Sequence, residues 1–99
     1  MRWSVNITPE AKLDIQEGIS WYSGKQKGLG KRFHKEVKNS IVRIEKNPFY
    51  AIKYSQVRCM PISKFPYLIH FTIEESNKAI IILGVLHTSL NPDENWFLE

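Results

Sequence analysis

The stretch LGKRFHKEVKNSIVRIEKNP, residues 29–48, decides the fold. Its apolar side chains recur every three or four residues, which is the spacing of one face of an α-helix. These side chains are Leu29, Phe33, Val37, Ile41 and Ile44. The helix is predicted to stop at Asn47, because a proline such as Pro48 disfavours helical geometry in the residue before it.

Another helix is predicted just before this one. Thr8 supplies a capping hydroxyl, and Pro9 fits the first helical position, where a missing N–H costs nothing. The apolar residues at helical spacing that follow are Ala11, Ile15, Ile19 and Tyr22. This pattern weakens near Lys25, so the turn to the next helix is short and predicts an antiparallel hairpin. The hairpin must bury its apolar stripes against another layer.

The remaining segments supply a sheet. Trp3, Val5 and Ile7 alternate with polar residues, which predicts an N-terminal strand. Further strands are predicted over residues 55–60, 65–73 and 78–87, with a polar turn at 74–77. The run 80–82 lacks alternation, which predicts a central strand buried on both faces. The expected fold is therefore α+β, in the order β-α-α-β-β-β, with the helical hairpin packed on a mainly antiparallel sheet.

Length and composition are those of one small domain. The chain has 99 residues, of which 42% are apolar, and we expect a single domain over residues 1–99. The longest apolar run, residues 79–86, is far shorter than the roughly twenty residues of a membrane-spanning helix. The polar N-terminus does not resemble a signal peptide. We therefore expect a cytoplasmic protein without a membrane segment.

Cysteine and histidine usage bears on redox and metal chemistry. Cys59 is the single cysteine, so no internal disulfide can form, and a small buried apolar role is its simplest interpretation. The three histidines lack the spacing of metal ligands. We expect no metal site and no cofactor.

The charge is concentrated in the middle of the chain. Residues 25–46 contain eight lysines and arginines against two glutamates, a net charge of +6. Such a surface favours an acidic protein partner or a phosphate backbone. The alternative is a solvated helix face without a partner.

Several short motifs together resemble one known family, the RelE/ParE toxin superfamily. They are residues 28–33 (GLGKRF), Ile44 to Pro48, Val57–Arg58, residues 65–67 (FPY), Val85–His87, Asn91–Pro92 and Trp96. The match spans nearly the whole chain and is closer to the ParE side, which includes plasmid stabilization proteins. The resemblance implies the growth-inhibiting toxin of a bacterial type II toxin–antitoxin pair, held inactive by an antitoxin encoded beside it.

One activity in this superfamily is enzymatic. RelE-like members cleave messenger RNA at the ribosome, where the 2′-hydroxyl attacks the adjacent phosphate; this chemistry needs acid–base groups and cations. His87 is the best acid–base candidate and Arg58 the best phosphate-stabilising candidate, with Lys53 and Lys64 as further contacts to nucleic acid or another target. Each of these residues also has an alternative role. His87 is then a structural hydrogen-bonding group, and Arg58 forms an ion pair or contacts the antitoxin. The two lysines then only keep the surface soluble.

The other activity needs no catalytic centre. ParE-like members poison DNA gyrase through a binding surface. Relatives often carry arginine where this chain has Ser89 and Leu90, and losing such a cation weakens RNA cleavage. The sequence therefore favours a ParE-like, non-nucleolytic toxin over an mRNA endoribonuclease. A degenerate module of the same fold, without toxicity, is the third possibility.

The resemblance also directs attention to antitoxin contacts. Antitoxins of such pairs are often acidic and partly disordered before binding, so the basic helix would complement one. The candidate contacts on this helix are Lys31, Arg32 and Lys35. Trp96 and Phe97 form an apolar C-terminal patch that either meets the antitoxin or folds back on its own domain.

Overall fold

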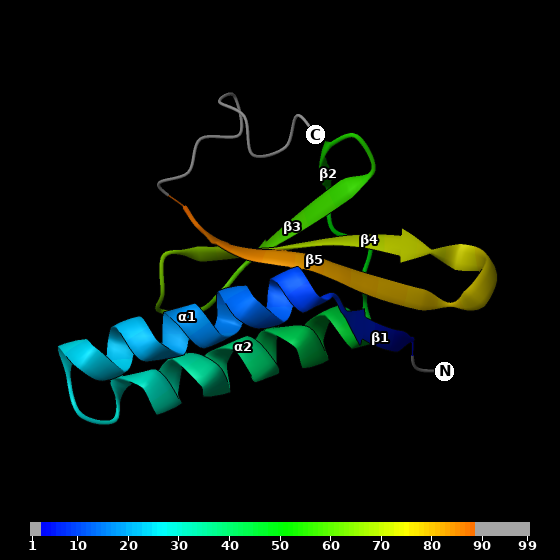
Figure 1. The fold of residues 1–99 in the computed structure, drawn as a ribbon. Coiled ribbons are helices and arrows are strands. Elements are labelled where there is room, and N and C mark those ends of the chain that lie inside the picture. Colours follow the sequence, from blue (N-terminus) through cyan, green and yellow to red (C-terminus); the bar gives the residue numbers. More distant parts are fainter. Residues whose placement is uncertain (1–2, 89–99) are drawn as a thin grey trace.

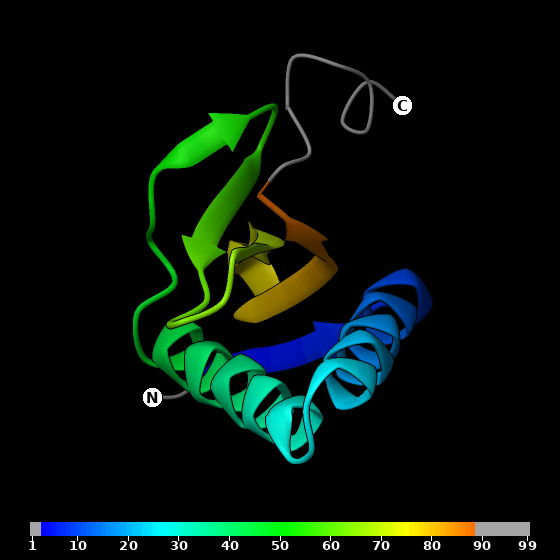
Figure 2. The ribbon, with the colours of Figure 1, turned by 90° about the vertical axis from the view of Figure 1, so that its left-hand side faces the viewer.

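The computed structural model describes residues 3–88 as two helices followed by most of a sheet (Figure 1). The elements in chain order are β1 Ser4–Ile7, α1 Pro9–Lys25, α2 Leu29–Lys46, β2 Ile52–Tyr54, β3 Val57–Pro61, β4 Tyr67–Glu74, the 3₁₀ helix η1 Glu75–Asn77 and β5 Ala79–His87. The predicted helical hairpin is confirmed, including its end at Asn47. Both helices lie on the same side of the sheet (Figures 1 and 2).

The sheet has five strands in the order β1-β5-β4-β3-β2. β1 runs parallel to β5 and every other pair is antiparallel, which confirms the predicted mainly antiparallel sheet. The prediction was wrong in two respects: β2 was not foreseen, and the strand expected from Ser55 begins at Val57. Ser55 has a φ of 49°, which places it in the left-handed region of a turn between β2 and β3.

Local chemistry fixes the two ends of α1 as predicted. The Oγ1 of Thr8 accepts a hydrogen bond from the Ala11 N–H at 3.1 Å, and Pro9 occupies the first turn. At the other end the Gln26 N–H donates to the Tyr22 carbonyl. Gly28, with a φ of +83°, then turns the chain into α2, a conformation that favours glycine.

Two glycines allow the helices to approach closely. A Cβ added at Gly18 of α1 would lie 2.5 Å from the Phe33 ring of α2. A Cβ added at Gly30 of α2 would lie 2.6 Å from the Ile19 carbonyl oxygen of α1. Each glycine therefore makes room for the opposite helix, which brings the apolar stripes of both helices onto one core.

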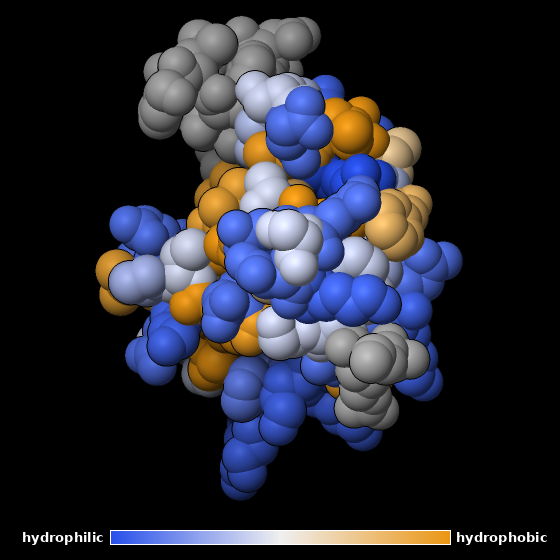
Figure 3. Space-filling model, turned by 90° about the vertical axis from the view of Figure 1, so that its right-hand side faces the viewer, coloured by the Kyte–Doolittle hydropathy of each residue, from blue (hydrophilic) through white to orange (hydrophobic). Residues whose placement is uncertain are grey.

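The core lies between the helices and the sheet. Its fully buried side chains come from both helices and from the central strands: Ala11, Phe33, Val37, Ile44, Ile69, Phe71, Ile80, Ile82 and Val85. On the face seen in Figure 3, by contrast, hydrophilic side chains dominate and apolar ones lie in separate areas. The core thus gathers the residues that the periodic patterns had indicated.

β5 is an interior strand of the sheet, with β1 and β4 as the predicted neighbours on either side. Ile80 and Ile82 are fully buried on the helix side. The expected burial on both faces is wrong in part, because Ile81 is half-buried and Leu83 is 38% exposed. The physical reason is that both helices cover the same face, and within residues 3–88 no α-helix lies on the other face (Figure 2).

Candidate functional site

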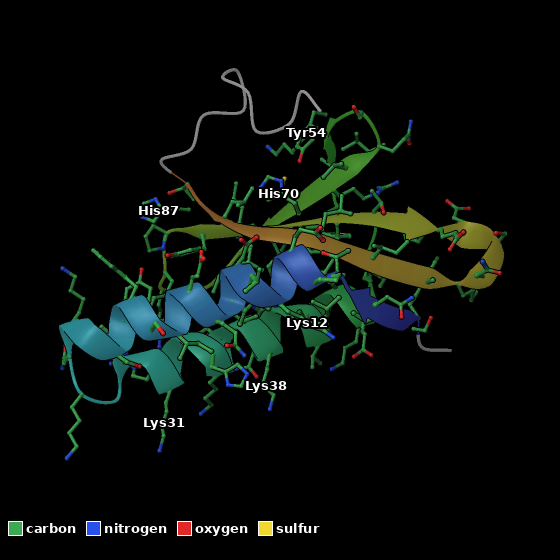
Figure 4. The ribbon with its side chains drawn as sticks, viewed as in Figure 1. Lys12, Lys31, Lys38, Tyr54, His70 and His87 are labelled. Atoms are coloured by element: carbon green, nitrogen blue, oxygen red, sulfur yellow. The ribbon has the colours of Figure 1, made fainter. Side chains whose placement is uncertain are left out.

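A buried polar cluster lies on the sheet face that points away from the helices (Figure 4). The Nδ1 of His70 is 3.0 Å from the Tyr54 hydroxyl oxygen and 3.4 Å from the Cys59 sulfur. His70 is 2% exposed and stands opposite Cys59 in the β3–β4 pair. Tyr54 comes from β2, so three strands each contribute one member.

The environment keeps this cluster uncharged at neutral pH. Burial lowers the pKa of His70 to about 4, so its imidazole is neutral. Burial raises the pKa of Cys59 to about 11, although the ammonium of Lys53 acts in the opposite direction. A protonated, buried thiol is a poor nucleophile. The cluster is therefore suited to holding β2, β3 and β4 together through hydrogen bonds.

The sequence predicted the positions of two members of this cluster but not the contact between them. Alternation had placed His70 on the opposite face from Ile69 and Phe71, and Cys59 was expected to be buried; both hold. The missing signal was the register of β3 on β4, which sets Cys59 beside His70. Tyr54 could not be placed because its strand was not predicted.

Arg58, the candidate phosphate-stabilising residue, anchors the segment between α2 and β2. Its guanidinium donates a hydrogen bond to the Tyr50 carbonyl at 2.7 Å and lies 5.4 Å from the centroid of the Phe49 ring. The Phe49 ring in turn meets Trp3 edge-on at 5.6 Å. One hydrogen bond of Arg58 and its contact with the Phe49 ring therefore serve the fold.

His87, the candidate acid–base residue, lies at the end of β5. It is exposed, and its ring packs edge-on against Tyr67 at 5.2 Å. His87 stands opposite Tyr67 on β4, whereas Arg58 stands opposite Phe71. Four residues along a strand correspond to about 13 Å. The structure therefore does not bring Arg58 and His87 together into one centre.

The two candidate lysines of the sheet are also apart. Lys53 is exposed on β2, next to the start of β3. Lys64 is exposed in the turn that follows β3, with a φ of 72°. They therefore stand at opposite ends of β3 and form no joint cation site with each other.

The candidate antitoxin contacts on α2 share one surface. Lys31, Arg32 and Lys35 are all exposed, whereas Phe33 and Val37 face the core. Lys31 and Lys38 point away from the sheet (Figure 4). The predicted basic face of the helix therefore exists. Trp96 and Phe97, together with Ser89 and Leu90, lie outside the described residues.

Two findings concern metals and membranes within residues 3–88. No group of three or more His, Cys, Asp and Glu side chains there is arranged to hold a metal ion. No helix in this part of the chain is long and apolar enough to cross a membrane. Tyr54, His70 and Cys59 form a hydrogen-bonded cluster.

Comparison with protein families decides the identity of the fold. Residues 5–92 match the family described as the ParE toxin of type II toxin–antitoxin systems, parDE. This chain belongs to the ParE toxin family. The match covers both helices and all of the sheet except the first residue of β1, and it confirms the resemblance that the sequence motifs indicated. A search among curated proteins found no match.

Solved structures support the fold of this ParE-family chain. It is similar to a chain of the chromosomal ParDE system from P. aeruginosa, with a TM-score of 0.72 and 16% identity over 86% of this chain and 95% of that chain. A chain of the intact E. coli RelBE toxin–antitoxin complex gives a TM-score of 0.65 and 9% identity, covering 86% and 95%. The isolated E. coli RelE toxin gives a TM-score of 0.66 and 8% identity, over 92% of this chain and 89% of that chain. At these identities the likeness concerns the fold.

Proposed function

We propose that this ParE-family toxin arrests bacterial growth in the cytoplasm by binding DNA gyrase, without cleaving RNA, and that a cognate antitoxin neutralises it. The separation of Arg58 from His87 carries this proposal. Cleavage by a 2′-hydroxyl needs a proton acceptor and a cation at the same phosphate. These two candidates lie about 13 Å apart along β4, judged from the rise of a strand.

The chemistry of the buried cluster supports the same conclusion. The pKa of His70 is lowered to about 4, and its imidazole is buried between Tyr54 and Cys59. A base that accepts a proton from RNA works best with a pKa near the working pH and with access to its substrate. Inhibition of gyrase makes no such demand, because a complementary surface is sufficient.

An antitoxin partner is supported by the comparisons and by charge. Two of the similar structures are described as the ParDE system and the RelBE toxin–antitoxin complex. Lys31, Arg32 and Lys35 provide an exposed basic face on α2. Such a face attracts an acidic partner and speeds its association at low salt.

Induced expression in a bacterial host tests the proposal. The chain is expressed alone and together with the adjacent open reading frame, and primer extension is run on abundant messages. We expect growth arrest, rescue by the adjacent gene and no codon-spaced cuts. Codon-spaced cuts would instead identify an mRNA endoribonuclease, and the absence of arrest would identify a non-toxic binding module.

His87→Gln provides the discriminating variant. The His87 side chain is exposed at a strand end, so its replacement has little effect on the fold. The variant is expected to keep full growth arrest if the toxin acts by binding gyrase. Arrest that disappears together with message cleavage would assign a catalytic role to His87. Arg58 is less suitable for this test, because its guanidinium holds the Tyr50 carbonyl.

A further inference from the structure

α1 presents large apolar side chains to solvent as well as to the core. Its inner side packs on the sheet through Ala11, Ile15 and Ile19. On its outer side Leu13 is 62% exposed and Trp21 is 58% exposed. Leu13 and Trp21 are eight positions apart, which leaves them about 80° apart around the helix axis, and both line one hollow on the outer side of the helix. Exposed apolar side chains that gather on one face mark interaction sites.

This side of α1 is hollowed in two adjoining places. One shallow hollow is lined by α1 alone, through Leu13, Gln16, Glu17, Ser20 and Trp21. The other is a cleft of about 330 Å³ between α1 and the end of β5, whose walls include Asp14, Glu17, Trp21, Tyr67 and Leu86. Glu17 and Trp21 border both hollows. We call the two hollows together the α1 surface.

Two acidic side chains line the α1 surface, next to His87 in the cleft and the Lys25 ammonium over the Trp21 ring. Asp14 and Glu17 line the cleft, and the Asp14 carboxylate accepts a hydrogen bond from the Val85 N–H at 3.1 Å. Burial raises the pKa of Asp14, the Val85 hydrogen bond opposes this, and the charges of Glu17 and Glu10 raise it further. A cation entering the cleft would relieve this crowding of negative charge.

The Trp21 ring is itself suited to cations. The ammonium of Lys25 lies 4.2 Å from the centroid of this ring, a cation–π geometry formed within the chain. Trp21 also borders the acidic cleft, so its ring, with Lys25 over one face only, lies beside two carboxylates. Arginine fits such a place best, because its planar guanidinium stacks on aromatic rings and pairs with carboxylates.

We infer that the α1 surface docks a segment of the antitoxin that places an apolar side chain against Leu13 and Trp21 and an arginine or lysine in the acidic cleft. This inference rests on the proposed function, in which an antitoxin neutralises the toxin. It assigns to α1 the opposite chemistry from α2, whose exposed face is basic. The antitoxin therefore meets this toxin through segments of opposite charge.

Affinity measurements on the purified toxin and the product of the adjacent reading frame test the inference. Trp21→Ala is expected to weaken binding about 30-fold, the loss typical of a central aromatic anchor. Glu17→Lys is expected to weaken it about tenfold at low salt and less at high salt, because screening reduces charge repulsion. Ile52→Ala is the matched control: Ile52 is 47% exposed on β2, outside both helices, and its truncation is expected to change affinity less than about twofold.

Hydroxyl-radical footprinting resolved by residue gives a second measurement on the unmodified proteins. Oxidation of Trp21 is expected to be fast in the free toxin and several-fold slower in the complex. Equal affinities of wild type and Trp21→Ala would overturn the inference while leaving the antitoxin partner in place. Protection of Trp21 already in the free toxin would overturn it as well, because another part of the chain or a second copy would then cover α1. The absence of any complex with wild-type toxin would instead overturn the proposed function.

Discussion

The two helices of the hairpin share one core but differ in the chemistry that they show to solvent. α2 separates its faces sharply, with Phe33, Val37 and Ile44 buried and a row of exposed lysines and arginines outside. α1 buries only its small residues fully and leaves Leu13 and Trp21 exposed beside Glu17. Apolar side chains stabilise the fold when they are buried, and those left in water indicate a surface that a partner covers.

The largest expected loss of stability distinguishes a buried ring on α2 from an exposed ring on α1. Phe33 of α2 is fully buried, and its ring packs against Tyr22, Phe65 and Tyr67. Phe33→Ala is expected to lower the free energy of unfolding by about 3–5 kcal/mol. Trp21→Ala removes a larger ring from the outside of α1 and is expected to cost less than about 1 kcal/mol. Urea unfolding of both variants checks this, and equal losses would show that Trp21 belongs to the core.

The second largest expected loss of stability comes from the close packing between the helices. Gly18→Ala forces a methyl group against the Phe33 ring and is expected to cost about 1–3 kcal/mol. Gly24→Ala is the matched control on the same helix, because an added Cβ there meets nothing within 4 Å. The control is expected to gain about 0.5–1 kcal/mol from the lower chain entropy of alanine. Thermal unfolding of the two variants measures these changes. An unchanged stability of Gly18→Ala would contradict the close approach of the helices.

A pH titration tests the buried polar cluster on the sheet face that points away from the helices. The folded-state pKa of His70 is about 4, below the ordinary 6.5, so between these values the unfolded chain binds the proton and the folded chain does not. Stability is therefore expected to fall by about 2 kcal/mol from pH 7 to pH 5. Denaturant unfolding of wild type and His70→Gln at both pH values measures how much of this fall in stability is due to His70. An equal fall in the variant would place the titrating group elsewhere.

The smallest effect concerns Asp14 on α1. Its pKa is raised mainly by burial, so above this pKa the charged carboxylate opposes folding, and stability rises as pH falls through it. Asp14→Asn keeps an acceptor for the Val85 N–H and removes the charge. The variant is expected to be slightly more stable than wild type at pH 7, by less than about 1 kcal/mol. A clear loss of stability in thermal unfolding would mean that the carboxylate charge is satisfied within the fold.

The helices could be predicted from the sequence because their signals are local. The stripe from Leu29 to Ile44 and the stop at Pro48 lie within one continuous segment. β2 escaped prediction because three residues at a sheet edge carry too little alternation to be recognised. Its position depends on pairing with β3, which is a contact between segments.

Most of the candidate site could not be predicted from the sequence, because it is built from contacts between distant segments. His87 was placed correctly at a strand end and Lys31, Arg32 and Lys35 on an exposed face, because each follows from one element. The Tyr54–His70–Cys59 cluster needs the register of three strands, and the acidic cleft needs the end of β5 beside α1. Periodicity alone does not distinguish an exposed Trp21 from a packed one.

The most direct measurement adds the purified toxin to a DNA gyrase supercoiling reaction, with ribosomes and messenger RNA in a parallel reaction. We expect supercoiling to be inhibited in a dose-dependent manner, the antitoxin to restore it, and the messenger RNA to stay intact. The opposite pattern, unaffected gyrase together with messenger RNA cut at the ribosome, would contradict a toxin that acts by binding alone.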